Sequence, residues 1–187
     1  VWPVSVTPDS NPSQVGDEPV MLVAETGCPM VVDPNRPRAI RELLRQHACD
    51  VVISDDGLQH YAMARQLEIA VVDGARRYGN GRCLPAGPLR ESVSRLRRVD
   101  AVVCQGEPLS NEFAMQLTVE AVVSMVDASK VTTLSDWEGQ TVHAIAGIGY
   151  PQRFFALLRA HGLRVIPHAF PDHHPYQQAD IQFGDDF

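Results

Sequence analysis

The sequence predicts an α/β fold in which a parallel sheet is flanked by helices. Short runs of β-branched apolar residues recur along the chain, and several end in an acidic residue, as buried parallel strands often do. An amphipathic helical pattern lies between two such runs, where a parallel crossover needs one. With 187 residues, 44% of them hydrophobic and 21% charged, the chain has ordinary globular composition and is long enough for one domain or two small ones.

The N-terminal third is expected to form a strand, helix, strand crossover. Residues 1–16 are rich in Pro, Ser and Asp and are predicted to be loop, and residues 20–24 a buried strand or the start of a helix. Residues 29–32 are a strand candidate, and the apolar positions within 36–47 follow helical spacing. Residues 51–54 then form a β-branched run, which predicts a buried parallel strand after the helix.

Two further strands are predicted around a long irregular loop. Residues 67–73 and 100–104 are apolar runs, the first with an acidic end. Between them, residues 78–91 contain three glycines and two prolines and therefore predict a shaped loop. Residues 89–96 are expected to begin a helix. Loops at the carboxyl ends of strands are where α/β proteins place specificity.

The C-terminal third is predicted to contain a ribbon and a second α/β unit. Residues 118–126 and 131–134 are strand candidates joined by a polar turn. A strand at 141–146, a helix after Pro151 and a strand at 163–166 follow. We therefore expect three parts, at 1–117, 118–140 and 141–187.

An acidic turn directly follows the predicted strand at 51–54. Asp55 and Asp56 stand before Gly57, at the edge of the sheet where open α/β folds bind ligands. Two adjacent carboxylates suit Mg²⁺, and the pattern resembles a Walker B strand. The alternative is that Asp55 and Asp56 only begin a turn. His60 is close enough in sequence to reach the same edge.

The distribution of charge is uneven. A net charge of −7 argues against a general nucleic-acid binder, yet seven of the fifteen arginines fall between positions 76 and 98. This stretch, residues 76–98, is called the arginine segment below. It is suited to phosphates or an anionic membrane surface, although a solvated helix face would explain its last three arginines. No apolar run approaches the roughly 18 residues of a transmembrane helix.

Two other patterns concern chemistry. The four cysteines are widely spaced and three adjoin apolar runs, which predicts buried free thiols in a reducing compartment. Near the C-terminus, Asp172 stands beside His173 and His174, a group that can ligate a metal or form a base. The chain has no Gly-x-x-x-x-Gly-Lys-Ser/Thr phosphate loop.

Three segments together resemble a known family. Asp-Asp-Gly-Leu-Gln-His at 55–60, Gly-Asn-Gly at 79–81 with Leu-Pro-Ala-Gly-Pro-Leu-Arg-Glu at 84–91, and Phe-Pro-Asp-His-His at 170–174 are similar to tetraacyldisaccharide 4'-kinase, the lipid A 4'-kinase of Gram-negative bacteria. Val-Gly-Asp-Glu-Pro at 15–19 also fits. The resemblance implies a P-loop-kinase-like parallel sheet, a two-stranded linker and the start of a second α/β domain.

The resemblance also implies an activity and a location. It implies transfer of the ATP γ-phosphate to the 4'-hydroxyl of tetraacyldisaccharide 1-phosphate at the cytoplasmic face of the inner membrane, through a peripheral contact or an N-terminal helix that this chain lacks. ATP would bind on a P-loop, which is also absent from the chain, so we expect the chain alone to be inactive. The implied partners are ATP, the acylated disaccharide and the membrane surface, and no nucleic acid.

Site residues follow from the resemblance by position. Asp17 would pair with His173 as the base that receives the sugar hydroxyl proton. Asp55 and Asp56 would hold Mg²⁺, with Glu91 as a third carboxylate.

Three further residues, His60, Asn80 and Arg90, would contact nucleotide or lipid phosphate. Phosphoryl transfer depends mainly on positioning and on neutralising charge, and these groups supply both. Two alternatives remain: a metal-dependent phosphoesterase of the Asp-His-His type, and a kinase-like module that binds lipid without turnover.

Overall fold

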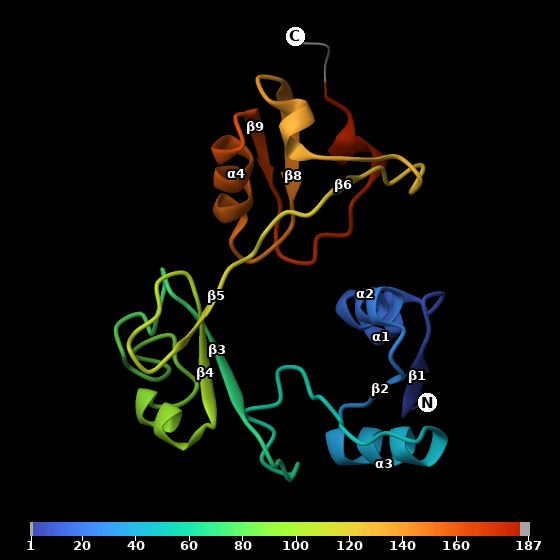
Figure 1. Cartoon of the computed structure of the whole chain (residues 1–187). Helices are drawn as coiled ribbons and strands as arrows, with labels where there is room; N and C mark the ends of the chain where they lie inside the picture. Colours follow the sequence, from blue (N-terminus) through green and yellow to red (C-terminus); the bar gives the residue numbers. More distant parts are fainter. Residues whose placement is uncertain (1, 184–187) are drawn as a thin grey trace. The chain divides into compact units, whose positions relative to one another are not determined.

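The computed structural model describes residues 2–183 and has an α/β fold, as predicted (Figure 1). The chain separates into two compact units, Val1–Gln116 and Leu117–Phe187, each of which is described by itself. The expected three-part division, with a separate linker at 118–140, stays a prediction. No helix in residues 2–183 has the length and apolar character needed to cross a membrane.

The first unit begins with a small antiparallel sheet covered by two helices. Strand β1 (Val4–Val6) pairs with β2 (Met30–Val32). Helices α1 (Pro12–Val15) and α2 (Asp17–Thr26) lie between them in sequence and contribute to the same apolar cluster. The prediction of loop throughout 1–16 was wrong, because the Asn11 side chain caps α1 by accepting a hydrogen bond from the Ser13 N–H.

The predicted helix after β2 is confirmed as α3 (Arg36–Gln46). The Asn35 side chain caps it, and a proline occupies its first turn, where a missing N–H costs nothing. Just before the helix, the buried Asp33 carboxylate accepts hydrogen bonds from the Asn35 N–H and from the guanidinium of Arg38. This pair fixes the start of α3 against the end of β2.

The expected parallel crossover around α3 was wrong. Residues 51–54 form no strand, and Val51 and Ile53 are 75% and 90% exposed. A β-branched run becomes a strand only where a neighbouring strand accepts its backbone hydrogen bonds. Within the described chain, no strand lies beside this run, and β2 pairs with β1 instead.

The sheet that carries the arginine segment is parallel. Strands β3 (Ile69–Asp73), β4 (Ala101–Gln105) and β5 (Phe113–Met115) pair in that order, which confirms the predicted strands at 67–73 and 100–104 (Figure 1). No pattern in the sequence predicted β5. The helix expected from residue 89 is a shorter 3₁₀ helix, η1 (Val93–Arg98), capped by Ser92.

The second unit contains the predicted ribbon and α/β elements. Short strands β6 (Val122–Val123) and β7 (Val131–Thr132) form the antiparallel ribbon, followed by η2 (Leu134–Trp137). Their pairing is shorter than the sequence pattern suggested, because Val126 and Met125 extend into solvent.

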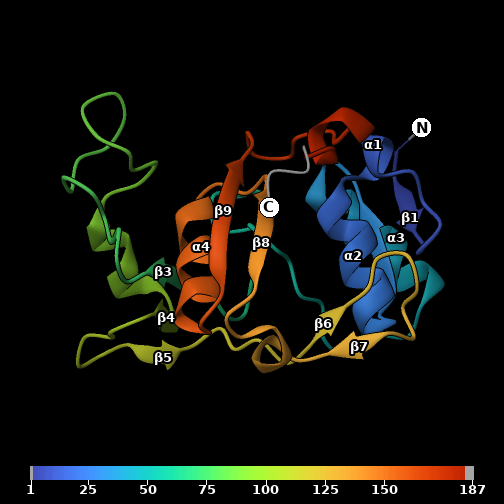
Figure 2. The same cartoon turned by 90° about the horizontal axis from the view of Figure 1, so that it is seen from above.

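A parallel pair of strands forms the core of this second unit. Strands β8 (Thr141–Ala146) and β9 (Arg164–Ala169) pair over their full length, and α4 (Pro151–Ala160) packs alongside them (Figures 1 and 2). Phe155 of α4 is 1% exposed and lies with Leu158 and Leu163 in the apolar cluster. The short helix η3 (Gln178–Ile181) follows.

The four cysteines are free, as predicted, but only Cys104 on β4 is fully buried. The expectation that they are buried was wrong for Cys28 and Cys83, which lie in exposed loops where their apolar neighbours are also exposed.

Candidate functional site

The acidic turn presents two carboxylates to solvent. Asp55 and Asp56 are both exposed, and Asp56 has a left-handed φ of 47°. Neither side chain makes a hydrogen bond or ion pair with any other residue in 2–183. The turn is tight at Gly57, where an added Cβ would lie 2.8 Å from the Ser54 Oγ. The carboxylate oxygens are therefore available to a ligand.

Arg65 fastens this turn to the sheet. Its Nη1 donates a 2.7 Å hydrogen bond to the Gly57 carbonyl, and its Nε lies 2.8 Å from a carboxylate oxygen of Glu68, just before β3. His60 belongs to the same turn, since its N–H donates to the Gly57 carbonyl at 3.0 Å. Sequence reasoning missed Arg65 because its acceptors are mainly backbone carbonyls.

The Asn80 side chain makes hydrogen bonds within its own loop. Its amide donates a 2.8 Å hydrogen bond to the Ala86 carbonyl, and its Oδ1 accepts one from the Arg82 N–H at 3.1 Å. An added Cβ at Gly87 would lie 2.1 Å from the Asn80 Oδ1 and 2.3 Å from the Arg82 carbonyl, so only glycine fits there. The predicted contact of Asn80 with phosphate stays a prediction.

Glu91 lies against the segment that follows the acidic turn. One oxygen accepts a 2.6 Å hydrogen bond from the Tyr61 hydroxyl, and the other a 2.8 Å bond from the Gln59 amide. These two hydrogen bonds, that of Tyr61 first, hold the pKa of Glu91 below its usual range. The preceding residue, Arg90, is exposed and has no ion-pair partner in the described chain.

The three carboxylates predicted to hold Mg²⁺ are not gathered into one cluster. Among residues 2–183, no three His, Cys, Asp or Glu side chains lie close enough together to bind a metal ion. Asp55 and Asp56 alone still offer the hard oxygen donors that Mg²⁺ prefers. The metal role of Glu91 stays a prediction.

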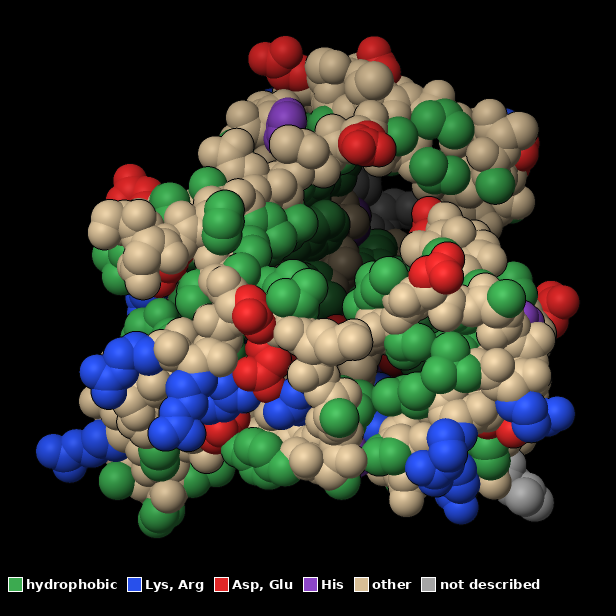
Figure 3. Space-filling view, turned by 60° about the horizontal axis from the view of Figure 1, so that its bottom comes forward, with side chains coloured by type: hydrophobic (Ala, Val, Ile, Leu, Met, Phe, Trp, Pro, Cys, Tyr) green, Lys and Arg blue, Asp and Glu red, His purple; other side chains and the backbone are tan. Residues whose placement is uncertain are grey.

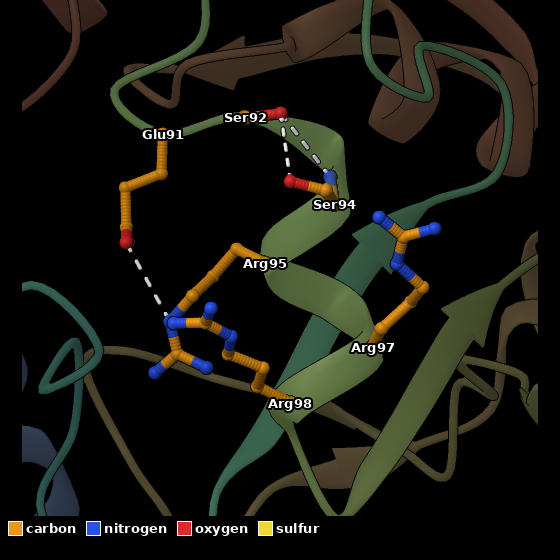
Figure 4. A pocket seen from close by; sticks show the side chains of 6 residues that line it. All are labelled: Glu91, Ser92, Ser94, Arg95, Arg97 and Arg98. Atoms are coloured by element: carbon orange, nitrogen blue, oxygen red, sulfur yellow. Dashed lines mark hydrogen bonds and ion pairs between the residues drawn. The ribbon is translucent and has the colours of Figure 1, made fainter.

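A shallow hollow of about 490 Å³ lies beside η1. It is lined by Glu91, Ser92, Ser94, Arg95, Arg97 and Arg98. Figure 4 shows Arg95 and Arg98 on one side of the helix, with Glu91 directed toward Arg95, and Arg97 on the other side.

Most guanidinium groups of the arginine segment are free to meet an anion. Arg77 pairs with Glu112 at 2.8 Å and Arg95 with Glu68 at 2.7 Å. The other five are exposed and have no acidic partner in residues 2–183, namely Arg76, Arg82, Arg90, Arg97 and Arg98. In the space-filling view, Lys and Arg side chains gather at the lower left and at the lower right (Figure 3).

In the second unit, His173 lies in a loop that packs on the glycine turn at residues 147–149. His173 has a φ of 55°, and its N–H donates to the Gly147 carbonyl at 3.2 Å. An added Cβ at Gly147 would lie 2.6 Å from the Tyr176 hydroxyl oxygen, and one at Gly149 would lie 3.6 Å from an Asp172 carboxylate oxygen. The glycine turn thus supports the backbone that carries the predicted base.

The neighbouring histidine forms an Asp-His pair that the sequence analysis did not identify. His174 Nε2 lies 3.0 Å from the Asp180 carboxylate, which also accepts a 2.8 Å hydrogen bond from the Gln177 N–H. The backbone bond and then His174 lower the pKa of Asp180. The rings of Phe170 and Tyr176 contact the imidazole. This group orders residues 170–181, called the histidine loop below.

Asp17, the predicted partner of His173, lies in the first turn of α2, after a glycine with a φ of 96°. There it is exposed and favourably placed for the helix dipole. Asp17 and His173 belong to different units, so their pairing stays a prediction.

Comparisons with known proteins give a consistent result. The family model described as LpxK, tetraacyldisaccharide-1-P 4'-kinase, matches residues 1–186. Curated relatives named tetraacyldisaccharide 4'-kinase include one from Nitrosococcus oceani, 50% identical over 98% of this chain and 54% of its own length, and one from Methylobacillus flagellatus, 52% identical over 97% and 55%.

A solved structure is also similar. It is the "apo" form of LpxK from Aquifex aeolicus in complex with ATP, which matches with a TM-score of 0.69 and 26% identity over 91% of this chain and 56% of that chain. The chain therefore spans about half the length of the curated relatives and of the structure that it matches.

Proposed function

The chain belongs to the tetraacyldisaccharide-1-P 4'-kinase family, and we propose on this basis that the protein phosphorylates the 4'-hydroxyl of tetraacyldisaccharide 1-phosphate with ATP. The observation that carries the proposal is the family match over residues 1–186, supported by relatives about half identical in sequence. The similar solved structure is of a protein in complex with ATP.

In the proposed reaction, His173, oriented by Asp17, takes the proton of the sugar hydroxyl. The resulting oxygen attacks the γ-phosphorus of ATP, the bond from that phosphorus to the β,γ-bridging oxygen breaks, and ADP leaves. A base held in one tautomer by a carboxylate suits this step.

Asp55 and Asp56 are proposed to hold Mg²⁺ because no described residue occupies their oxygens. When bound there, the ion would offset the negative charge of the phosphates. Arg90, exposed and without an acidic partner in residues 2–183, is suited to a phosphate oxygen. His60 and Asn80 are proposed to line the same region, with Asn80 acting mainly through the shape of its loop.

A membrane surface is the proposed setting, at the cytoplasmic face of the inner membrane. The substrate is a lipid, so the enzyme must work at a lipid surface. The arginine segment holds seven of the chain's sixteen cationic residues and one of its 23 acidic ones, so it carries +6 while the remainder carries −13. Such a local excess favours contact with anionic lipid head groups.

The test is transfer of ³²P from ATP labelled in the γ-phosphate to tetraacyldisaccharide 1-phosphate by the complete natural protein that carries this chain. His173→Ala should reduce the rate by about 10²- to 10⁴-fold, the range for loss of a general base. His161→Ala is the matched control, because His161 is exposed at the end of α4 and should leave the rate unchanged. No labelled lipid from the folded wild-type protein with Mg²⁺ present would overturn the proposal.

A further inference from the structure

Glu91 connects two parts of the first unit that are far apart in sequence. Its carboxylate accepts hydrogen bonds from Gln59 and Tyr61, which lie 32 and 30 residues earlier. Each oxygen has its own donor. The bond from the tyrosine hydroxyl is the shorter, at 2.6 Å, in the range typical of a hydroxyl donating to a charged acceptor.

Burial does not explain the place of Tyr61. The residue is 68% exposed, whereas the Glu91 side chain is only 19% exposed. A tyrosine so exposed adds little to a hydrophobic core. Its main described interaction is therefore the hydrogen bond from its hydroxyl to Glu91.

A second set of contacts joins the same two regions. Arg95 lies 3.5 Å from Glu91 and pairs with Glu68 at 2.7 Å. Glu68 also binds Arg65, whose guanidinium donates to the Gly57 carbonyl in the acidic turn. The arginine segment is thus tied to the acidic turn by two routes, one direct through Gln59 and Tyr61 and one through the shared carboxylate of Glu68.

We propose that Gln59 and Tyr61 are positioning residues that hold Glu91 and thereby fix Arg90 relative to the acidic turn. Because Glu91 directly follows Arg90, fixing its carboxylate restricts the backbone from which the Arg90 guanidinium extends. The acidic turn carries Asp55 and Asp56. The role in catalysis rests on the proposed kinase function, whereas the mechanical role of the contact does not.

The kinetic test compares Tyr61→Phe with Tyr150→Phe in the complete natural protein that carries this chain. Both changes remove one hydroxyl from an exposed ring, but the Tyr150 hydroxyl makes no hydrogen bond with a described residue. Tyr61→Phe should lower kcat by about tenfold, the size expected for a hydrogen bond to a charged group. The Mg²⁺ concentration for half-maximal rate should not change, and Tyr150→Phe should behave as wild type.

A double-mutant cycle separates positioning from general damage. If Tyr61 acts through Arg90, then adding Tyr61→Phe to Arg90→Ala should lower kcat no further. Full additivity of the two changes would overturn the proposal. A changed Mg²⁺ requirement in Tyr61→Phe would also overturn it, because the hydroxyl would then act through the metal.

Hydrogen exchange of the backbone tests the contact without any activity. In Tyr61→Phe, amides at 79–91 should exchange several-fold faster than in wild type, while those of β8 and β9 stay unchanged. Unchanged exchange at 79–91 would overturn the inference even if the wild-type enzyme is an active kinase. If amides at 79–91 exchange faster in Tyr61→Phe but the wild-type protein transfers no phosphate, the positional role of the contact is retained and the proposed function is rejected.

Discussion

The arginine segment and the histidine loop both carry predicted site residues in irregular chain, but they are held in different ways. No side chain of the arginine segment is buried. Hydrogen bonds of Asn80 shape its loop, and contacts with the carboxylates of Glu68, Glu91 and Glu112 hold its charged side chains. The histidine loop follows β9, which packs with α4, and its aromatic and imidazole rings contact one another. It contains no arginine or lysine.

This difference separates two ways of ordering a loop. A segment held by charged contacts is available to anionic ligands, and its order depends on each carboxylate. A loop held by ring contacts next to an apolar core depends on that core and tolerates changes of charge elsewhere. The dependence on carboxylates can be tested in the arginine segment, and the dependence on the apolar core in the histidine loop. In each test the other region serves as the internal control.

The largest expected effect is on the core beside the histidine loop. Phe155→Ala should lower the free energy of unfolding of the second unit by about 3–5 kcal/mol, because a side chain 1% exposed leaves a cavity. Hydrogen exchange in urea should show this loss at β8 and β9 and in the histidine loop, and not in the arginine segment. Phe113→Ala, at a residue 65% exposed, should change stability by about 0.5 kcal/mol or less. An equal increase of hydrogen exchange in the arginine segment and in the histidine loop would contradict the proposed difference between the two regions.

The next effect concerns the free guanidinium groups. Replacing both Arg97 and Arg98 with glutamine should weaken binding to vesicles that contain anionic lipid by roughly 30-fold at low salt, since each basic residue near such a surface contributes about 1 kcal/mol. Co-sedimentation with vesicles measures this. The control is the pair Arg41→Gln and Arg159→Gln, which removes the same charge from exposed positions outside the segment. Equal loss in both double variants would show that only net charge matters.

The sequence predicted the elements that are specified by local pattern. The apolar runs at β3, β4, β8 and β9 and the helical spacing of α3 were all found, because each has neighbours within the chain. Residues 51–54 have an equally strong strand pattern, but no strand within residues 2–183 lies beside them. A β-branched run predicts that a strand is possible, and hydrogen-bonding partners decide whether it forms.

The candidate site was predictable in part for a similar reason. Residue type and spacing marked Asp55, Asp56 and His173 as chemical groups, whereas Gln59, Tyr61 and Asp180 act through contacts that no local spacing indicates. Gln59 and Tyr61 meet Glu91 from about 30 residues away. Only the folded chain shows such contacts.

A third prediction compares one carboxylate from each region. Glu112→Gln should weaken the pair with Arg77, and Asp180→Asn the pair with His174. Limited proteolysis should then cut faster by about threefold to tenfold, a modest effect because each pair keeps at least one partly exposed side chain. Cleavage should increase between residues 77 and 91 in the first variant and within the histidine loop in the second. Faster cleavage of the other region in either variant would contradict the separate control of the two regions.

The smallest expected effect is the dependence of these two contacts on acid. The pKa of Glu112 is lowered by the Leu109 N–H and then by Arg77, and that of Asp180 by the Gln177 N–H and then by His174. A carboxylate with a lowered folded pKa adds stability that is complete above its unfolded pKa and is lost as the pH falls through the folded value. The melting temperature of wild type should therefore exceed that of Glu112→Gln and of Asp180→Asn by constant amounts from pH 7 to pH 5, and the differences should shrink only below about pH 4, the usual carboxyl range. A difference for Asp180→Asn that already falls between pH 7 and pH 5 would contradict this account, since titration of the carboxylate alone leaves the difference constant there. The arginine in the other pair stays charged throughout this range, so Glu112→Gln supplies a reference in which only the carboxylate titrates.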